Sequence, residues 1–375
     1  NRSMGIGGNS LLMGADLSLL KRNMEQGAAY YLGGNPVEPV STFRKSGFEW
    51  ARLRLFHTPS RHGAQCTDLP YTLALAILLK EAGFQLLLDL HYSDTWADPG
   101  KQYVPKAWAG MDFPTLEQTV YSYTCETVAE FIKAGAGPDM VQVGNEITPG
   151  MLWEHGRVAE AHDVNTPHWQ REESSNNNEA WARFGRLLKA GIHGVHDAST
   201  RPTEIMMHID RGGDIPTNQW FFDNLLDQGV GFDAIGQSYY PFWHGMPDDL
   251  AETLDFLGKR YGKDLYLAEV AYPHKHHEMY ENALSGDQAG WERLTGKYPL
   301  SPDGQKRFME DVIKIVAEST HGKGIFYWAP EWIPMTGFDD EPDAPPCWAR
   351  ALFDERGNAL PTLGVFAQTP ELAPA

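Results

Sequence analysis

The chain has 375 residues, a length that suits one large α/β domain. Its 31 Lys and Arg against 50 Asp and Glu give a net charge of −19, which repels nucleic-acid phosphates and anionic lipid surfaces. No run of about 18 uncharged apolar residues occurs, so we expect no membrane insertion. A neutral ligand fits this composition better, and 12 Trp and 15 Tyr offer flat faces on which a sugar ring could stack.

Three cysteines, Cys66, Cys125 and Cys347, form neither a CxxC pair nor a Cys/His cluster at zinc spacing. A single disulfide and three free thiols are equally compatible with them, so they leave the redox compartment open. Residues 1–10 lack the apolar stretch of a signal peptide, and we expect a mature or trimmed chain if the protein is exported. We expect a monomer.

Eight short apolar runs alternate with segments of helical period along the chain. The runs are 11–15, 49–55, 84–90, 140–143, 204–208, 234–238, 265–268 and 325–328. The helical segments include 71–82, 116–134, 178–195, 250–261 and 305–319, and polar loop-like stretches lie at about 155–178 and 274–304. This alternation predicts a parallel sheet closed into a (β/α)8 barrel with extended loops, and residues 1–375 as one catalytic domain.

A barrel enzyme carries its working residues at the C-terminal ends of its strands. In this sequence, polar or aromatic side chains stand at or near the ends of the runs: Asp16, Arg52, Arg54, His91, Asn145, Glu146, His208, Asp210, Tyr239, Tyr240, Glu269 and Trp328. The pattern therefore predicts a functional site at this end of the barrel.

Two of the runs end in a glutamate. The run 140–143 stops just before Asn145 and Glu146, and the run 265–268 stops at Glu269. Taken singly, Glu146 could cap a helix start and Glu269 could pair with a neighbouring strand. At the ends of strands four and seven, however, the two acids face each other across the barrel mouth. Because two carboxyls about 5–5.5 Å apart perform retaining glycoside hydrolysis, we interpret Glu146 as general acid/base and Glu269 as nucleophile.

Other polar side chains are expected around this pair. An arginine of the second run can keep Glu269 ionised by charge-assisted hydrogen bonds. We expect only one of Arg52 and Arg54 to face inward and favour Arg52, with the other in a salt bridge between barrel and helix. Tyr240 can donate its hydroxyl to Glu269, and a buried tyrosine with a backbone partner is the alternative.

Two histidines and several tryptophans complete the set of candidates. His91 and His208 end the third and fifth runs, where each could hold a sugar hydroxyl or be a core residue with both ring nitrogens satisfied. Four tryptophans follow predicted strands and could form sugar platforms, although each could equally belong to the core: Trp96, Trp153, Trp328 and Trp332.

At these residues the sequence resembles glycoside hydrolase family 53, the endo-β-1,4-galactanases. The similarity runs from about residue 12 to about residue 366, and its most diagnostic motif is HYSDTWADPGKQ at 91–102. Further matching motifs lie at 14–18, 52–56, 144–153, 207–210, 238–242, 269–273 and 327–333.

The resemblance implies a retaining hydrolase that cleaves β-1,4-galactan or galacto-oligosaccharides without a cofactor, in a secreted, periplasmic or cell-surface location. It implies Glu146 as acid/base and Glu269 as nucleophile. It also implies substrate contacts from the following side chains: Arg52, His91, Asp94, Trp96, Asn145, His208, Tyr240 and Trp328.

The sequence departs from the family pattern in three places. Tyr272 stands where the family usually has Trp, residues 211–214 lack a loop Trp, and Glu331 is displaced by two positions from its usual place after the eighth strand. Sugar subsites away from the cleavage point could therefore differ. A structural calcium is possible in the late loops, with weak candidate ligands in an acidic stretch that could equally be solvated: Asp339, Asp340 and Asp343.

Three alternatives remain open from the sequence. The same chemistry could act on another β-1,4-glycan, such as mannan or xylan, because an enzyme distinguishes an axial from an equatorial sugar hydroxyl by only a few contacts. A non-catalytic carbohydrate-binding barrel would keep the tryptophans but would not need Glu146 and Glu269. A metal-dependent barrel hydrolase is disfavoured, because the first strand has no His-x-His pair.

Overall fold

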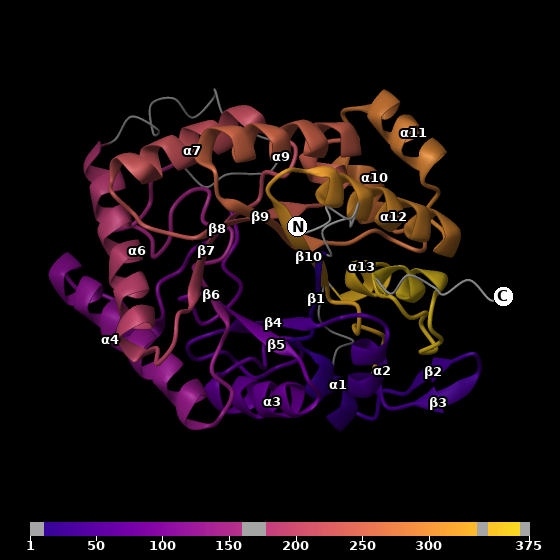
Figure 1. Ribbon diagram of the computed structural model, residues 1–375, viewed down its shortest axis with the longest axis horizontal. Helices are drawn as coiled ribbons and strands as arrows, with labels where there is room; N and C mark the ends of the chain where they lie inside the picture. Colours follow the sequence, from indigo (N-terminus) through magenta and orange to yellow (C-terminus); the bar gives the residue numbers. More distant parts are fainter. Residues whose placement is uncertain (1–10, 160–177, 336–343, 368–375) are drawn as a thin grey trace, which may run out of the picture.

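The computed structural model describes residues 11–159, 178–335 and 344–367. Eight parallel strands form a closed barrel, and Figure 1 shows the long helices around it as an outer ring. The barrel closes because β1 pairs with β4 on one side and with β10 on the other. The predicted (β/α)8 fold is confirmed.

The barrel strands follow the predicted runs to within a few residues. They are β1 (Leu12–Asp16), β4 (Trp50–Leu55), β5 (Gln85–Leu90), β6 (Met140–Val143), β7 (Glu204–Ile209), β8 (Ala234–Tyr239), β9 (Asp264–Val270) and β10 (Gly322–Trp328). A small antiparallel pair, β2 (Tyr30–Leu32) and β3 (Asn35–Val37), lies outside the barrel.

Five long helices match the predicted helical segments: α3 (Leu69–Glu81), α4 (Phe113–Lys133), α6 (Asn178–Ala198), α9 (Pro247–Tyr261) and α12 (Pro302–Glu318). The periodicity did not identify the others, which are α1 (Leu20–Glu25), α2 (Pro39–Lys45), α7 (Ile215–Asp227), α8 (Pro241–His244), α10 (Glu278–Ala283), α11 (Gln288–Lys297) and α13 (Ala344–Trp348), with 3-10 turns η1 (Lys106–Trp108) and η3 (Pro361–Phe366). The expected loop at 274–304 thus contains two short helices, which begin at side-chain caps rather than at an apolar stripe.

Local sequence signals start several of the helices. In α3, α4 and α7 an aspartate precedes the helix and a proline occupies its first turn. Asp68, Asp112 and Asp214 each accept a hydrogen bond from the backbone N–H three residues later. Proline fits the first turn because it lacks the N–H that would be unpaired there. These caps fix where each βα loop ends and the helix begins.

The inside of the barrel changes from apolar to polar along the strands. The apolar floor consists of Leu87, Met140, Met206, Ala234, Tyr266, Ala268 and Phe326, with Leu12 and Trp50 packed against it. Further along the same faces, nearer the C-terminal ends, lie the buried polar residues Asp16, Arg52, Asp89, Gln142 and His208. Since side chains two apart share a strand face, the polar layer sits directly above the floor, at the barrel mouth.

Strand β9 carries an extra residue beside Glu269. Against β8, Gln237 is opposite Leu267 and Ser238 is opposite Glu269, so Ala268 is skipped. The pairing with β10 shifts over the same stretch. Because side chains alternate and Ala268 belongs to the apolar floor, regular pairing would turn Glu269 outward toward the helices. The bulge instead turns Glu269 into the barrel mouth.

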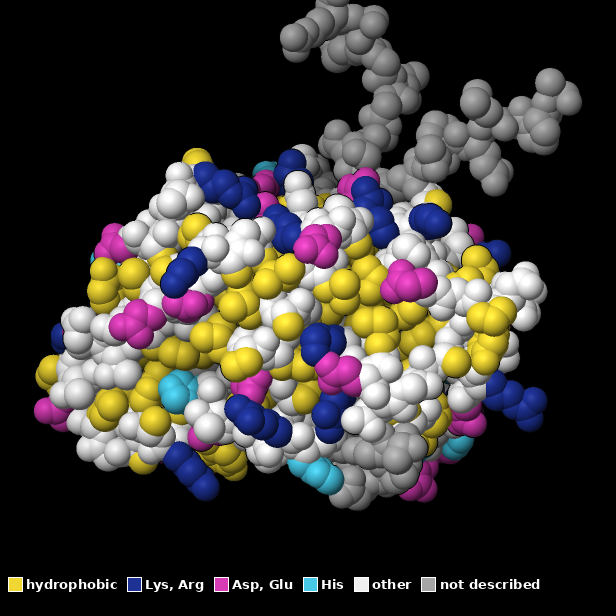
Figure 2. All heavy atoms as spheres, turned by 90° about the horizontal axis from the view of Figure 1, so that it is seen from below, with side chains coloured by type: hydrophobic (Ala, Val, Ile, Leu, Met, Phe, Trp, Pro, Cys, Tyr) yellow, Lys and Arg dark blue, Asp and Glu magenta, His cyan; other side chains and the backbone are white. Residues whose placement is uncertain are grey.

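The surface in Figure 2 carries basic and acidic side chains of the described residues interspersed with apolar and uncharged ones. A mixed face of this kind does not provide the continuous basic strip that follows a nucleic-acid backbone. Within the described ranges, no helix is both long enough and apolar enough to cross a membrane.

Candidate active site

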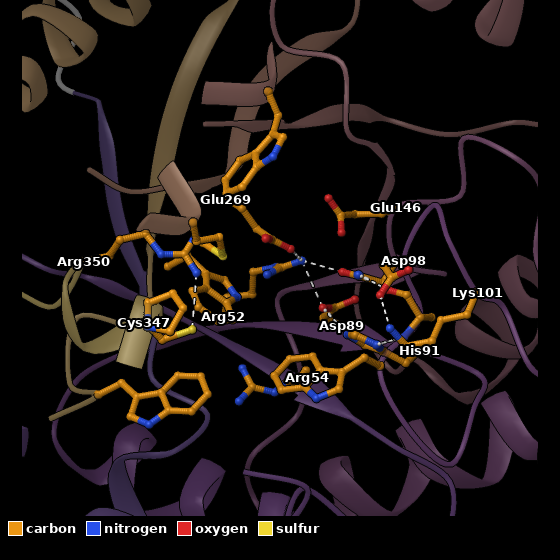
Figure 3. Close-up of a pocket in the computed structure, with 18 residues that line it drawn as sticks. Arg52, Arg54, Asp89, His91, Asp98, Lys101, Glu146, Glu269, Cys347 and Arg350 are labelled. Atoms are coloured by element: carbon orange, nitrogen blue, oxygen red, sulfur yellow. Dashed lines mark hydrogen bonds and ion pairs between the residues drawn. The ribbon is translucent and has the colours of Figure 1, made fainter. Parts of the chain in front are cut away.

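A cleft with about 830 Å³ of open space lies at the C-terminal ends of the strands. Its walls come from β4, β5, β9 and β10, from the loops after β5 and β6, and from α8, α10 and α13. Figure 3 shows Glu146 and Glu269 in this cleft, with Arg52 and Asp89 below them. The barrel therefore brings the two predicted acids to one cavity.

The two carboxyl groups are close enough for a double displacement. One oxygen of Glu146, one oxygen of Glu269 and one ring nitrogen of His208 all lie within 4.8 Å of one another. A retaining pair is separated by about 5–5.5 Å, whereas an inverting pair needs roughly 6.5–9.5 Å to hold a water between the carboxyls. The separation therefore supports the retaining geometry.

Glu269 is held by a cation and a phenol. Arg52 Nη2 lies 3.2 Å from Glu269 Oε2, and the Tyr240 hydroxyl donates to Glu269 Oε1 at 2.7 Å. Burial raises the pKa of Glu269, while Arg52 and the hydrogen bond from Tyr240 oppose that rise. Burial also raises the pKa of Tyr240 well above its usual value, so the phenol remains a hydrogen-bond donor. These contacts favour the carboxylate form that a nucleophile needs.

The expectation that only one of Arg52 and Arg54 faces inward is wrong. Both are buried and both line the cleft, because residues two apart lie on the same face of a strand. Their roles differ nevertheless. Arg52 pairs with Asp16 at 3.1 Å and with Asp89 at 2.9 Å, in addition to Glu269. Among the described residues, Arg54 pairs with Asp16 alone, at 3.4 Å, and forms no salt bridge from barrel to helix.

Glu146 lies in a different environment. Its backbone has φ 45°, a left-handed conformation that non-glycine residues rarely adopt, and its N–H donates to His208 Nδ1 at 3.2 Å. Burial raises the pKa of Glu146 well above its usual value, and the negative charges of Glu269 and Asp210 raise it further. A protonated carboxyl is what a general acid needs.

The remaining polar candidates are held in fixed orientations. Asn145 accepts from Arg52 at 2.8 Å and donates to the Ala97 carbonyl at 2.7 Å. His91 Nε2 lies 3.1 Å from Asp89 Oδ2, and His91 Nδ1 accepts from the Ala97 N–H at 3.0 Å. The structure thus brings Asn145 and His91 to the cleft.

One ring nitrogen of His208 lies within 4.8 Å of an oxygen of each glutamate, but His208 is not among the residues that line the cleft. Its Nδ1 is within 2.8 Å of Gln142 Nε2 and also accepts from Glu146, and its Nε2 is within 2.8 Å of Ser238 Oγ. Burial and the charge of Arg52 lower the pKa of His208 well below its usual value, so the ring is neutral. Both nitrogens are occupied, which suits a positioning role for the acid/base better than coordination.

The aromatic candidates divide into two groups. Trp96, Trp328 and Trp332 line the cleft, and the rings of Trp96 and Trp328 are 6.2 Å apart. Trp153 does not line this cleft and packs against Arg157, whose guanidinium carbon lies 4.3 Å from the ring centroid. Tyr272 is fully buried and stacks on Phe308, so it is a core residue.

Asp94 and the candidate calcium ligands are not found in the cleft described here, for different reasons. Asp94 is not among the residues that line the cleft, and its two carboxylate oxygens accept from the N–H groups of Thr58 and Lys106. It therefore orders the loop that carries Trp96. The candidate calcium ligands lie outside the described residues: Asp339, Asp340 and Asp343.

Sequence reasoning missed several residues in and beneath the cleft. Gln142 donates to Asp89 at 2.8 Å and accepts from Arg52 at 3.1 Å, so it links the polar layer. Position 142 lies on the inward face of its predicted strand, and this parity was a usable signal. Arg350 and Cys347 also line the cleft, but they follow β10 in a segment without strand or helix period.

Residues 12–366 of the chain match the sequence model of Glycosyl hydrolase family 53. The chain belongs to this family. It is 34% identical over 333 residues to an arabinogalactan endo-beta-1,4-galactanase of Cellvibrio japonicus, covering 86% of this chain and 80% of that protein. It is 30% identical over 361 residues to the enzyme of the same name from Thermothelomyces thermophilus, covering 94% and 98%.

A solved structure gives the same result. The family 53 catalytic domain of Ignisphaera aggregans superimposes with a TM-score of 0.81 at 33% identity, covering 98% of each chain. The resemblance inferred from the motifs is therefore confirmed, and the chain is a glycoside hydrolase.

Proposed function

We propose that this family 53 hydrolase cleaves β-1,4-galactosidic bonds within galactan or type I arabinogalactan, with retention of the anomeric configuration. The observation that carries the proposal is the separation within 4.8 Å of the Glu146 and Glu269 oxygens in one cleft. Relatives at 30–34% identity carry the name arabinogalactan endo-beta-1,4-galactanase, which supports galactan over other glycans.

In the first step, Glu269 attacks the anomeric carbon while Glu146 gives its proton to the departing glycosidic oxygen. A covalent glycosyl-enzyme forms, and the shortened chain leaves with a new hydroxyl. Glu146, now ionised, takes a proton from water as the water attacks the same carbon, which releases Glu269 and restores Glu146 to its acid form. The surroundings support both roles, because Arg52 stabilises one carboxylate, while desolvation and neighbouring negative charges raise the pKa of the other carboxyl.

The cycle balances with water as the only co-reactant, so we propose that catalysis needs no cofactor. We also propose that the protein acts as a monomer. Because a polysaccharide is degraded where it lies, we also propose a secreted, periplasmic or cell-surface location.

The decisive experiment offers galactan, xylan and mannan to the purified protein and follows new reducing ends and product lengths. We expect internal cleavage of galactan, retained activity in EDTA, and a first-formed β-anomer by NMR. Preferred cleavage of xylan or mannan would replace galactan as substrate, and binding without cleavage would indicate a carbohydrate-binding barrel. A first-formed α-anomer would contradict the double displacement.

A further inference from the structure

Arg350 places an unusual positive charge in the cleft. The side chain follows α13, lines the cleft and is 8% exposed. Its guanidinium carbon lies 5.0 Å from the ring centroid of Trp328 and 5.1 Å from that of Tyr240. Figure 3 shows Arg350 and Cys347 on one side of the pocket and Asp98 and Lys101 on the other.

The charge of Arg350 is not balanced by a carboxylate of the described residues. Its polar contact is Nη2 to Cys347 Sγ at 3.3 Å, and its Nε has no hydrogen-bond partner. By contrast, Arg52 pairs with three carboxylates, and Lys101 pairs with Asp98. A guanidinium this buried normally has an anionic partner, because desolvating a lone charge is costly.

A second guanidinium faces the same indole. The Arg54 carbon lies 5.9 Å from the Trp328 centroid and 4.4 Å from the Trp96 centroid. Its Nε and Nη2 are buried and have no hydrogen-bond partner. The charge of Arg54 is matched by Asp16, whose Oδ1 lies 3.4 Å from Arg54 Nη1. Two guanidinium groups therefore lie near the Trp328 ring, and of these Arg350 is the one without a carboxylate partner among the described residues.

We propose that this site accepts a sugar unit bearing a carboxylate, a uronic acid residue within or attached to the galactan chain. Arginine is suited to this ligand because its planar donors match a carboxylate and its charge persists at all relevant pH values. The unit stacks on Trp328, and its carboxylate pairs with the guanidinium of Arg350, which lines the cleft and has no carboxylate partner among the described residues. This inference rests on the proposed galactan hydrolysis, since it names a substituent recognised in the same cleft.

A matched set of ligands tests the proposal. β-1,4-Galacto-oligosaccharides of three to five units are compared with the same compounds oxidised at C6 of the non-reducing unit, and with the methyl esters of the oxidised compounds. We expect kcat/KM for the carboxylate form to exceed that for its neutral ester by roughly tenfold or more. Binding of galacturonate, its methyl ester and galactose to the wild-type protein, followed by calorimetry, gives a readout that does not depend on turnover.

Arg350→Met removes the charge while keeping a similar length of side chain, and we expect it to abolish the preference for the carboxylate. Arg186→Met is the matched control, because Arg186 also lies over an aromatic ring, at 4.8 Å from Phe113, but on the exposed surface. The control should keep the wild-type preference. If Arg350→Met does not fold, the calorimetric comparison of acid and ester in the wild-type protein decides instead.

If the wild-type protein shows the same kcat/KM and the same binding affinity for the acid and for its ester, the proposal is overturned. A preference that persists in Arg350→Met would also overturn it. If the protein cleaves neutral galactan but shows no preference for the carboxylated substrate, the proposed function stands and only the uronic acid proposal is rejected. Tighter binding of a sulfated oligosaccharide than of the carboxylated one would assign the guanidinium groups to a sulfate ester and also contradict a uronic acid.

Discussion

The ends of β6 and β9 present the same functional group in opposite surroundings. Glu269, on β9, lies beside the Arg52 guanidinium and the Tyr240 hydroxyl. Glu146, just after β6, is half-buried near the negative charges of Glu269 and Asp210. Two identical side chains thus acquire different proton affinities from their neighbours, and this difference agrees with the proposed roles of nucleophile and acid.

The two strand ends also reach the cleft by different backbone devices. A bulge in β9 turns Glu269 inward, whereas Glu146 has a positive φ and its backbone N–H donates to His208. Both devices are local departures from regular geometry, and both lie next to the chemistry. Variants that remove each carboxyl, or a neighbour of each carboxyl, test whether these surroundings set the two roles.

Removing the nucleophile should have the largest effect. We expect Glu269→Ala to lower kcat by roughly 10⁴-fold or more, because no covalent intermediate can form. Azide should enter the space left by the carboxylate and restore turnover, giving a glycosyl azide of inverted anomeric configuration. Glu310→Ala, on the exposed face of α12, is the control and should behave as wild type. Wild-type turnover in Glu269→Ala would reject Glu269 as the nucleophile.

Removing the Arg52 cation should lower the stability of the fold and the fraction of Glu269 that is ionised. Arg52→Met removes one buried cation from beside Asp16, Asp89 and Glu269, and breaking such a pair costs about 3–5 kcal/mol of unfolding free energy. The pKa of Glu269 should rise further, so the acidic limb of the kcat/KM profile should move to higher pH. Chemical denaturation and a pH series measure the two effects. An unchanged acidic limb in the folded variant would show that Arg52 does not control Glu269.

The barrel was predictable because its strands are short buried runs separated by helices of regular period. The polar mouth was predictable for the same reason, since each run ends in a polar residue. The orientation of Glu269 was not, because strand alternation alone turns this side chain outward, and the bulge that reverses it depends on pairing with both neighbouring strands.

Two arginines show the other limits of sequence reasoning. The expectation for Arg54 failed because Arg52 and Arg54 were assigned to opposite faces of the strand, whereas residues two apart lie on the same face. Arg350 could not be placed, because it reaches the cleft from a loop segment whose path depends on tertiary contacts after β10. The predicted roles of Glu146, Glu269 and the surrounding binding residues remain predictions until the variants are measured.

A smaller effect is expected from the phenol. Tyr240→Phe removes the 2.7 Å hydrogen bond to Glu269 without opening a cavity, and one such bond to a charged group is worth about 1.5–3 kcal/mol. We expect kcat/KM to fall by roughly 10- to 100-fold, with the acidic limb shifted to higher pH. Tyr239→Phe is a matched control, because the Tyr239 hydroxyl donates to the Gly245 carbonyl instead. Equal losses in both variants would indicate packing rather than the hydrogen bond.

The smallest effect isolates the acid. Asp210 raises the pKa of Glu146 through its negative charge, so Asp210→Asn should lower that pKa. A general acid with a lower pKa loses its proton at lower pH, and the alkaline limb of the kcat/KM profile should therefore move toward acidic pH, by up to about one unit. The acidic limb, which reports Glu269, should stay in place, because Arg52 and Tyr240 remain. A shift of both limbs together would mean that the two carboxyls titrate as one coupled pair, and the division of roles between β6 and β9 would then belong to the pair rather than to its members.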